Sequence, residues 1–317
     1  MYKILLSVFL IAGVACKQKP PVSEKIKTNI QNSKTDKHVN IPGTRLYIVP
    51  PTGFSVSSTP AGLQKGDSSM ITIADLTTGN FYSNTASFNK KGFEQKGIKI
   101  FDYQDIKVNG FPAKYVSLQG DANAKMYWLV FGDSSFSTML MGVYPAADQT
   151  TGNQIVSALN TIHYDKTKKV DPFEAAAFSL DDKQSKFKFF QFNANMYVYT
   201  IDGVNNKDNP DAPFIVVTQM PKDRNTTTKE VARMILDKMQ GYGLTNAEVK
   251  NATQEKIDGY DAYEAEVHGQ MEGKASIIFQ FVIAKGDKVI SMQGVTKTDL
   301  EENLQAFRSL SRTIRFK

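Results

Sequence analysis

Cysteine is almost absent from this chain: of 317 residues, only Cys16 is a cysteine. Residues 17–317 therefore form no disulfide among themselves, and any folded part must be stabilised by hydrophobic cores, which a chain of this length can build. Histidine is also scarce, with three residues, and tryptophan occurs once. A structural zinc site needs several spaced cysteine and histidine ligands, so this composition almost excludes one.

The apolar N-terminus is too short to span a bilayer, which requires about 20 apolar residues. Lys3 gives a positively charged start, and residues 4–15 carry no charge and are mostly apolar. This length is typical of the core of a signal peptide. The small residues of the stretch GVAC then lead directly to Cys16. We expect residues 1–15 to be a signal peptide.

The stretch GVAC also resembles a bacterial lipobox, although Gly13 stands where leucine is usual. The alternative is an ordinary signal peptide followed by an incidental cysteine. The resemblance implies a lipoprotein in which Cys16 is the lipidation site and becomes the new N-terminus. Several acyl chains, such as palmitate, would anchor it stably to the membrane. Lys17 in place of aspartate implies sorting to the outer membrane, and the lack of an acidic patch after Cys16 favours the periplasmic side.

The net charge of +6 does not indicate a nucleic-acid partner, because of where the charge lies. Residues 17–40 contain six lysines, with Glu24 and Asp36 as the acidic residues, whereas the rest of the chain is nearly neutral. Nucleic-acid binding requires a basic stripe on a folded surface. Residues 16–40 are rich in Pro, Ser, Asn, Gln and Lys, which predicts a flexible basic tether, weakly attracted to an anionic leaflet.

Two parts of the chain resemble each other. The stretches QIVSALNTIHY (154–164) and AFRSLSRTIRF (306–316) lie 152 residues apart, and the same spacing pairs Gly142 with Gly294. Upstream, IKVNGFPAKYVSLQG and EKIDGYDAYEAEVHG match at a spacing of 149 residues. Such self-similarity predicts two copies of one structural unit. The predicted first domain is 41–166, the connector is 167–173, and the second domain is 174–317.

Each unit is predicted to contain short strands, a helix, three strands joined by turns, and a closing helix. Residues 226–243 carry a threonine cap candidate, apolar residues at helical spacing and a glycine stop. The corresponding segment 85–97 is interrupted by Gly92. Asn-Gly and Asp-Gly pairs at 109–110 and 258–259 are hairpin signals. We therefore expect an α+β fold of two tandem α/β/α sandwiches, each an antiparallel sheet with helices packed on it.

This order of elements resembles the PsbP-like fold, which includes photosystem II PsbP proteins, Mog-type Ran-binding proteins and bacterial lipoproteins. The residues that carry the resemblance are Gly110 and Ala113, Gly259 and Ala262, and the terminal stretches NTIHY and RTIRF. The resemblance covers both units and implies binding modules or assembly factors rather than enzymes. It supplies no catalytic residue, and we expect no cofactor.

The sequence contains no recognisable catalytic constellation. His38, His163 and His268 are isolated from one another in sequence, and we expect them to be lone surface residues. The stretch GDSS (132–135) lacks the G-x-S-x-G pattern of a nucleophile elbow and is interpreted as a hairpin turn. The simple nucleotide-binding signatures are absent.

Two further features have a structural and a functional interpretation. Residues 202–211, DGVNNKDNPD, are rich in oxygen ligands, but the glycine and final glutamate of an EF-hand are missing. A solvated loop is favoured over a calcium site. Trp128 lies in the stretch MYWLVF, where alternating aromatic residues are more typical of core or edge packing than of a ligand cavity.

The sequence thus favours a non-catalytic, membrane-tethered protein that binds or assembles a protein partner in the cell envelope. The first alternative is a carrier of a small apolar molecule or lipid, which requires a dry pocket of several hundred Å³. The second is a hydrolase with an unrecognised site, which requires carboxylate, histidine or serine side chains that converge in a cleft.

Overall fold

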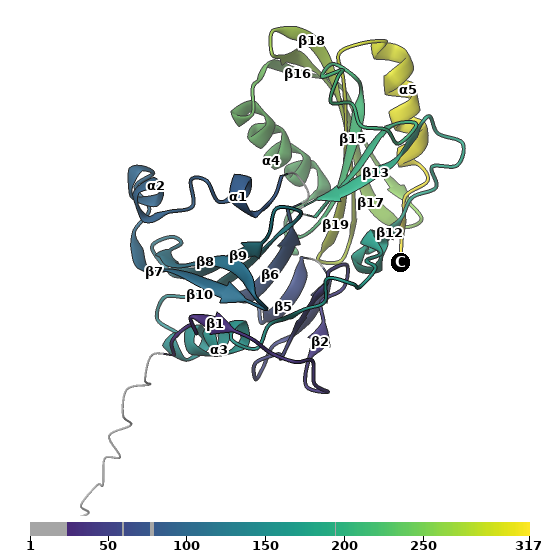
Figure 1. Ribbon diagram of the computed structural model, residues 1–317. Coiled ribbons are helices and arrows are strands. Elements are labelled where there is room, and N and C mark those ends of the chain that lie inside the picture. Colours follow the sequence, from purple (N-terminus) through teal and green to yellow (C-terminus); the bar gives the residue numbers. More distant parts are fainter. Residues whose placement is uncertain (1–23, 59, 77–78, 194) are drawn as a thin grey trace, which may run out of the picture.

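The computed structural model describes residues 24–58, 60–76, 79–193 and 195–317 (Figure 1). The predicted signal peptide, 1–15, and the predicted lipidation site, Cys16, lie outside the described residues. Among the described residues, no helix is long and apolar enough to cross a membrane. The largest structural units of the described chain are two sheets that follow each other in sequence.

The first half of the chain forms an eight-stranded sheet in the order β1-β7-β8-β9-β10-β6-β5-β4. A small sheet of β11, β3 and β2 lies beside it. The elements of this half are β1 (Asn29–Ile30), β2 (Val39–Asn40), β3 (Leu46–Ile48), β4 (Ser55–Ser58), β5 (Ala61–Lys65), β6 (Ser69–Asp75), α1 (Phe81–Asn84), α2 (Lys90–Gln95), β7 (Ile100–Val108), β8 (Phe111–Gln119), β9 (Ala124–Gly132), β10 (Ser137–Pro145), α3 (Gln149–Leu159) and β11 (His163–Tyr164).

The second half forms a seven-stranded sheet in the order β13-β14-β15-β19-β18-β17-β16, with β12 and β20 as a separate pair. A short 3₁₀ helix, η1, leads into it. Its elements are η1 (Pro172–Ala175), β12 (Phe178–Ser179), β13 (Phe187–Asn193), β14 (Met196–Ile201), β15 (Phe214–Pro221), α4 (Thr228–Gly241), β16 (Leu244–Ile257), β17 (Tyr260–Met271), β18 (Lys274–Lys285), β19 (Lys288–Thr296), α5 (Leu300–Ser311) and β20 (Arg315–Phe316).

Apart from the two-residue β1, the two large sheets have the same strand order. Each half has three strands, then helix, then four strands, and the last of the four lies beside the third: β10 beside β6, and β19 beside β15. The prediction of three strands after the helix is therefore wrong by one. β7 lies near a sheet edge and β16 lies at one. β16 exposes most of its residues, and β7 buries only Ile106 and Val108, so their sequences lack a clear apolar alternation along the whole strand.

The predicted hairpin turns are confirmed in both halves. Asn109 and Gly110 have φ angles of 47° and 84°, and Asp258 and Gly259 have 50° and 82°. These left-handed conformations are those of a type I′ turn, which favours Asn or Asp followed by Gly. The two turns join β7 to β8 and β16 to β17, and so set the register of both hairpins.

Helices pack on both faces of each sheet, as the α+β prediction requires. In the first half, α3 covers one face, while α1 and α2 lie on the other. In the second half, α5 covers the face that corresponds to that of α3, and α4 covers the opposite face. Of the predicted helix at 85–97, only α2 is helical, because Asn89 caps its start by accepting a hydrogen bond from the Gly92 N–H. The four-residue α1 lies just before the predicted range.

The longer helix α4 begins and ends close to the predicted bounds. Thr227 and Glu230 form a capping box, in which each side chain accepts a hydrogen bond from the other residue's backbone N–H. Val231 and Ala232 are buried against the sheet. The helix ends at Gly241, one of the two glycines that were expected to stop it.

The described part of the predicted tether differs from the expectation of a flexible segment. From Glu24 onward the chain packs against the first half, with Ile26 and Ile30 buried in its core. Asn29–Ile30 adds a parallel strand to the outer edge of β7, and Val39–Asn40 pairs with β3. The two isoleucines contribute to holding this lysine-rich stretch in place, because each buries a large apolar side chain. We call residues 24–40 the strap.

The two halves touch through a small number of polar contacts. Gln219 on β15 accepts a hydrogen bond from the N–H of Ala177 and donates to the carbonyl oxygens of Ala175 and Ser58, at 2.7, 2.9 and 3.0 Å. Its side chain is buried, and Ser58 belongs to β4 of the first half. The Gly43 N–H also donates to the Glu174 carboxylate, at 3.1 Å. The Ser58 bond joins β4 to β15, and the Gly43 bond joins the loop before β3 to the segment that leads into the second sheet.

Candidate functional site

The three histidines lie in two different places, and none is a free surface residue. His38 and His163 both fasten the strap. A ring nitrogen of His38 lies 2.8 Å from the Thr161 carbonyl oxygen, and one of His163 lies 2.8 Å from the Asn32 carbonyl oxygen. His268 lies on β17 of the second half, beside Glu266. The expectation of lone surface histidines is therefore wrong in its detail, since each has a hydrogen-bond partner.

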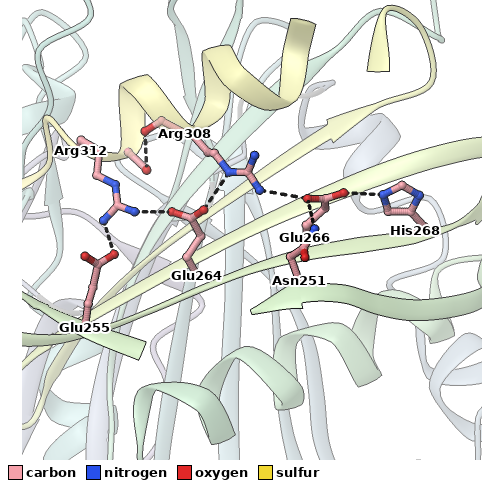
Figure 2. Close-up of polar contacts among 8 residues, drawn as sticks. Asn251, Glu255, Glu264, Glu266, His268, Arg308 and Arg312 are labelled. Atoms are coloured by element: carbon pink, nitrogen blue, oxygen red, sulfur yellow. Dashed lines mark hydrogen bonds and ion pairs between the residues drawn. The ribbon is translucent and has the colours of Figure 1, made fainter. Parts of the chain in front are cut away.

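His268 belongs to the most extensive cluster of titratable side chains in the described residues (Figure 2). Glu264, Glu266 and His268 alternate along β17, so their side chains share the sheet face on which α5 lies. Arg308 and Arg312 are one helical turn apart on α5 and reach over them. Asn251 and Glu255 join from the edge strand β16. We call these seven residues the ladder.

Each charged group in the ladder has a partner of opposite charge. Arg308 donates from Nε to Glu264 at 2.9 Å and from Nη2 to Glu266 at 3.0 Å. Arg312 donates from Nη2 to the other oxygen of Glu264 at 2.7 Å, and from Nη1 to Glu255. The Glu264 and Glu266 side chains are only 11% and 9% exposed. Burial at this level requires such pairing, because an unpaired buried carboxylate is costly.

The protonation of Glu266 follows from these contacts. Burial by itself raises the pKa of this carboxyl group. Hydrogen bonds from Asn251, His268 and Arg308 outweigh the burial and hold the pKa below its ordinary value of 4.5. Near neutral pH Glu266 is therefore ionised and accepts three hydrogen bonds, at 2.9, 2.6 and 3.0 Å. A general acid needs a raised pKa, so this group is poorly suited to that role.

Among the described residues of the first half, the ladder has no counterpart. At the 149-residue spacing, Tyr115 and Ser117 take the places of Glu264 and Glu266, and at 152 residues Val156 takes the place of Arg308. Tyr115 stacks on Tyr127 at a ring distance of 6.0 Å. The sequence signal for the ladder is an alternation of Glu, Glu and His on a strand, together with two arginines four residues apart on a helix.

The serine-containing stretch 132–135 is a hairpin turn, as predicted. It joins β9 to β10, and Asp133 accepts hydrogen bonds from the backbone N–H and the hydroxyl of Ser135, at 2.7 and 2.6 Å. Lys166 lies 2.8 Å from the same carboxylate. These bonds hold the pKa of Asp133 well below its ordinary value, with the Lys166 contact as the largest cause. Ser135 thus faces an ion-paired carboxylate in a turn.

The oxygen-rich stretch 202–211 lies between β14 and β15. Its last residue, Asp211, pairs with Lys274 and Lys297, and Lys297 also pairs with Glu272 at 2.6 Å. These lysines lower the pKa of Asp211, with Lys274 the main cause. Across the described residues, no group of three or more His, Cys, Asp or Glu side chains is arranged to hold a metal ion. The geometry here is that of an ion-paired loop.

Trp128 packs in the apolar layer between the sheet and α2. Its ring lies 6.2 and 5.9 Å from the rings of Phe88 and Phe93. The indole N–H is buried and has no hydrogen-bond partner. The prediction of core packing for Trp128 is confirmed.

Two hollows in the described surface are large enough to consider as binding sites. One, of about 440 Å³, lies between α1 and the β7–β8 hairpin and is open to solvent. Its lining combines Phe81, Tyr82 and Pro112 with the ion pair of Asp105 and Lys114, 2.8 Å apart. The other, of about 190 Å³, lies at the turn between β18 and β19. A charged pair in its wall makes the larger hollow unlike the dry pocket that a lipid carrier requires.

No protein-family model matches the chain, and no curated protein matches it. Among solved structures, it is similar to the cyanobacterial PsbP protein CyanoP of Synechocystis sp. PCC 6803, with 13% identity, 48% of this chain and 100% of that chain covered, and a TM-score of 0.31. It is also similar to LpqN of Mycobacterium tuberculosis, which is involved in cell envelope biogenesis. The identity is 14%, the alignment covers 43% of this chain and 82% of that chain, and the TM-score is 0.33.

A third similar structure is the T6SS immunity protein TplEi of Pseudomonas aeruginosa. The identity is 11%, the alignment covers 89% of this chain and 98% of that chain, and the TM-score is 0.33. All three TM-scores are below 0.5, so none of these similarities carries an argument about function. The chain has an α+β fold with two large sheets that share one strand order, apart from β1.

Proposed function

We propose that this protein is a non-catalytic, lipid-anchored binding or assembly module of the cell envelope, built from two PsbP-like units. The observation that carries the proposal is the ladder. Its carboxylates, arginines and histidine are the groups that acid–base chemistry would use, and they pair with one another between α5 and the sheet. Groups held in this way stabilise a surface rather than act on a substrate.

The proposal includes duplication of one ancestral unit, at 41–166 and 174–317, with the strap as an addition to the first. Three internal comparisons support it. The two large sheets have the same strand order apart from β1, and both halves have a type I′ turn at the corresponding hairpin. Gly142 and Gly294, which are 152 residues apart, lie in close contact with α3 and α5 respectively. Two units on one chain offer a partner two adjacent surfaces. Binding to both would raise the overall affinity through effective concentration.

The anchor in this proposal is Cys16, acylated after removal of residues 1–15. Glu24, where the strap begins, is eight residues further along the chain. A chain of eight residues spans at most about 29 Å when extended. The first half would therefore stay close to the membrane surface. Lys17 favours the outer membrane, and the lack of an acidic patch after Cys16 favours its periplasmic side. A partner would be another envelope protein.

A carrier of a small apolar molecule is the second candidate, because of the hollow between α1 and the β7–β8 hairpin. Tyr82 and Phe81 supply aromatic surface there. The open shape and the Asp105–Lys114 pair count against a lipid tail and allow only a ligand with polar groups.

The test is crosslinking and pull-down from membranes of cells that express the wild-type chain or Cys16→Ala. We expect the wild type in the membrane fraction with a defined protein partner, and Cys16→Ala in the soluble fraction with that partner lost. A wild type that is already soluble would refute the anchor. An anchored protein that recovers only lipid or small molecules would refute the assembly role in favour of the carrier.

A further inference from the structure

The hollow at the turn between β18 and β19 has a filled counterpart in the first half. The hollow is lined by Ala177, Lys285, Asp287, Lys288, Phe316 and Lys317. The β9–β10 turn is the corresponding turn, because β10 matches β19 at the 152-residue spacing that pairs Gly142 with Gly294. The cross-strand register is the same at both turns, since Phe131 pairs with Thr138 and Ile283 pairs with Ile290. Phe136 therefore occupies the position of Lys288.

In the first half, an aromatic ring fills this place. The ring of Phe136 stacks on Tyr164 at 4.8 Å with an interplanar angle of 3°, and meets the edge of Phe111 at 5.0 Å. The counterparts of Tyr164 and Phe111 are Phe316 and Tyr260. Those two rings are present in the second half, 5.1 Å apart, but the third ring is missing.

A second large side chain is also lost from the second half. Leu46 pairs with Tyr164 and Phe178 pairs with Phe316, so Ala177 takes the place of Arg45. The Arg45 guanidinium lies 3.9 Å from Asp75 and donates to the Lys168 carbonyl oxygen at 3.2 Å, and so occupies space beside the aromatic stack. Replacement of Phe by Lys and of Arg by Ala accounts for the hollow.

We propose that this hollow receives an aromatic side chain from an acidic segment of a partner protein. The inference rests on the proposed function as a binding module and names the chemistry that the partner presents. The volume of about 190 Å³ is sufficient for one ring, since a cavity of about 150 Å³ binds benzene. The partner's ring would stack on Phe316 as Phe136 stacks on Tyr164.

The rim sets the charge of the partner segment. Three lysines and one aspartate line the hollow. The Lys285 ammonium lies 5.4 Å from the Tyr260 ring centroid and 5.8 Å from that of Phe316. The Lys317 ammonium donates to the Phe173 carbonyl oxygen at 2.9 Å. Acidic residues on either side of the entering ring would complement this rim, while the ring supplies the buried anchor.

The probe is the fluorescently labelled peptide Asp-Asp-Phe-Asp-Asp, titrated into the purified full chain while anisotropy is measured. The matched peptide has Leu in place of Phe. We expect the Leu peptide to bind about two- to twelve-fold more weakly, which is the range for the loss of one aromatic pair. Added salt should weaken both peptides, because the rim charges are exposed.

The decisive variant is Lys288→Phe, which places a ring where the first half has Phe136. We expect at least a tenfold loss of Phe-peptide affinity, because the hollow is then filled. Lys288→Gln removes only the charge, and should weaken binding about two- to fivefold. Lys229→Gln, an exposed lysine on α4, should leave binding unchanged. Ala177→Leu fills the hollow from the opposite wall and repeats the test if Lys288→Phe does not fold.

Equal binding of the Phe and Leu peptides, or full binding by both filled variants, would overturn the inference. Its failure is separable from that of the proposed function. If membranes yield a defined protein partner but the peptide does not compete with it, only the aromatic-pocket inference falls. If no protein partner is recovered, the proposed function itself falls.

Discussion

At the scale of single residues, the second half has a sheet face that carries charged side chains and is still covered by the helix α5. β17 alternates between apolar residues that face α4 and the polar residues Glu264, Glu266 and His268 that face α5. The arginines of α5 neutralise this polar row and also cover it. Arg312 lies over the Phe281 ring at 5.8 Å, so its hydrocarbon and guanidinium surfaces bridge the ladder and the core.

Glu266→Gln should make the free energy of unfolding change less with pH in the acidic range. The pKa of Glu266 is lowered in the folded protein, so its contribution is complete above the ordinary value of 4.5 and is lost as the pH falls below it. We expect the variant to be about 1–3 kcal/mol less stable at pH 7, because hydrogen bonds to a charged group are lost. The difference from wild type should shrink between pH 5 and 3, as urea unfolding would measure.

The control for this substitution is Glu94→Gln, on the exposed surface of α2. It should leave the acid dependence of stability unchanged. A Glu266→Gln variant whose deficit stays constant down to pH 3 would contradict the role assigned to this carboxylate. Asn251, His268 and Arg308 all face Glu266, so none of them is altered in the comparison.

At the scale of elements, the same close contact recurs where the closing helix of each half crosses its sheet. A Cβ atom at Gly142 would lie 2.6 Å from Ile155 Cγ2 of α3, and one at Gly294 would lie 2.5 Å from the Phe307 ring of α5. Neither glycine has a positive φ angle, so the need for glycine comes from space and not from backbone conformation. Residues 152 apart thus solve the same packing problem in both halves.

Gly294→Ala should destabilise the protein by about 1–3 kcal/mol, because the added methyl group forces the rigid Phe307 ring or the whole of α5 to shift. Thermal or urea unfolding measures this. Gly241→Ala in α4 is the matched control, since nothing lies within 4 Å of its Cβ position. We expect that variant to be no less stable than the wild type, because the added methyl group meets no other atom. Equal effects of the two substitutions would contradict the packing argument.

At the scale of the whole molecule, the relation between the two halves depends on few contacts. Gln219 is only 2% exposed and holds three backbone groups, two from the segment before β12 and one from β4. At the corresponding place in the first half stands Asp75, whose pKa is raised, mainly by burial. An uncharged amide at position 219 can both accept from an N–H group and donate to carbonyl oxygens, which a carboxylate cannot.

Gln219→Ala should loosen the junction between the halves. The buried N–H of Ala177 and the carbonyl oxygens would lose their partner, at a cost of about 1–3 kcal/mol for each group that stays unsatisfied. We expect faster hydrogen exchange in peptides that cover β4 and residues 172–179, with β17 and β18 unchanged. Gln254→Ala, on the exposed strand β16, is the control. Unchanged exchange at both segments of the junction would refute the role of Gln219.

Much of the fold was predictable because its signals are local. The threonine cap and glycine stop of α4 and the Asn-Gly and Asp-Gly turns each depend on residues close in sequence. Those predictions are confirmed. The edge strands β7 and β16 were missed as separate elements, because their pattern is set by exposure at the rim of a sheet and not by local propensity.

The sequence by itself determined the α+β class, the hairpin turns, the main helices and the internal similarity, since each depends on near neighbours or on a repeated pattern. Only the tertiary structure decided that the strap folds onto the first half and that the ladder joins β16, β17 and α5. It also decided that an aromatic ring fills the space at the β9–β10 turn, whereas the space at the β18–β19 turn is a hollow. The strap contact between Lys25 and Asn160 and the ladder contact between Glu266 and Arg308, for example, join residues 135 and 42 positions apart. Their partners are chosen by packing and burial, which local sequence does not encode.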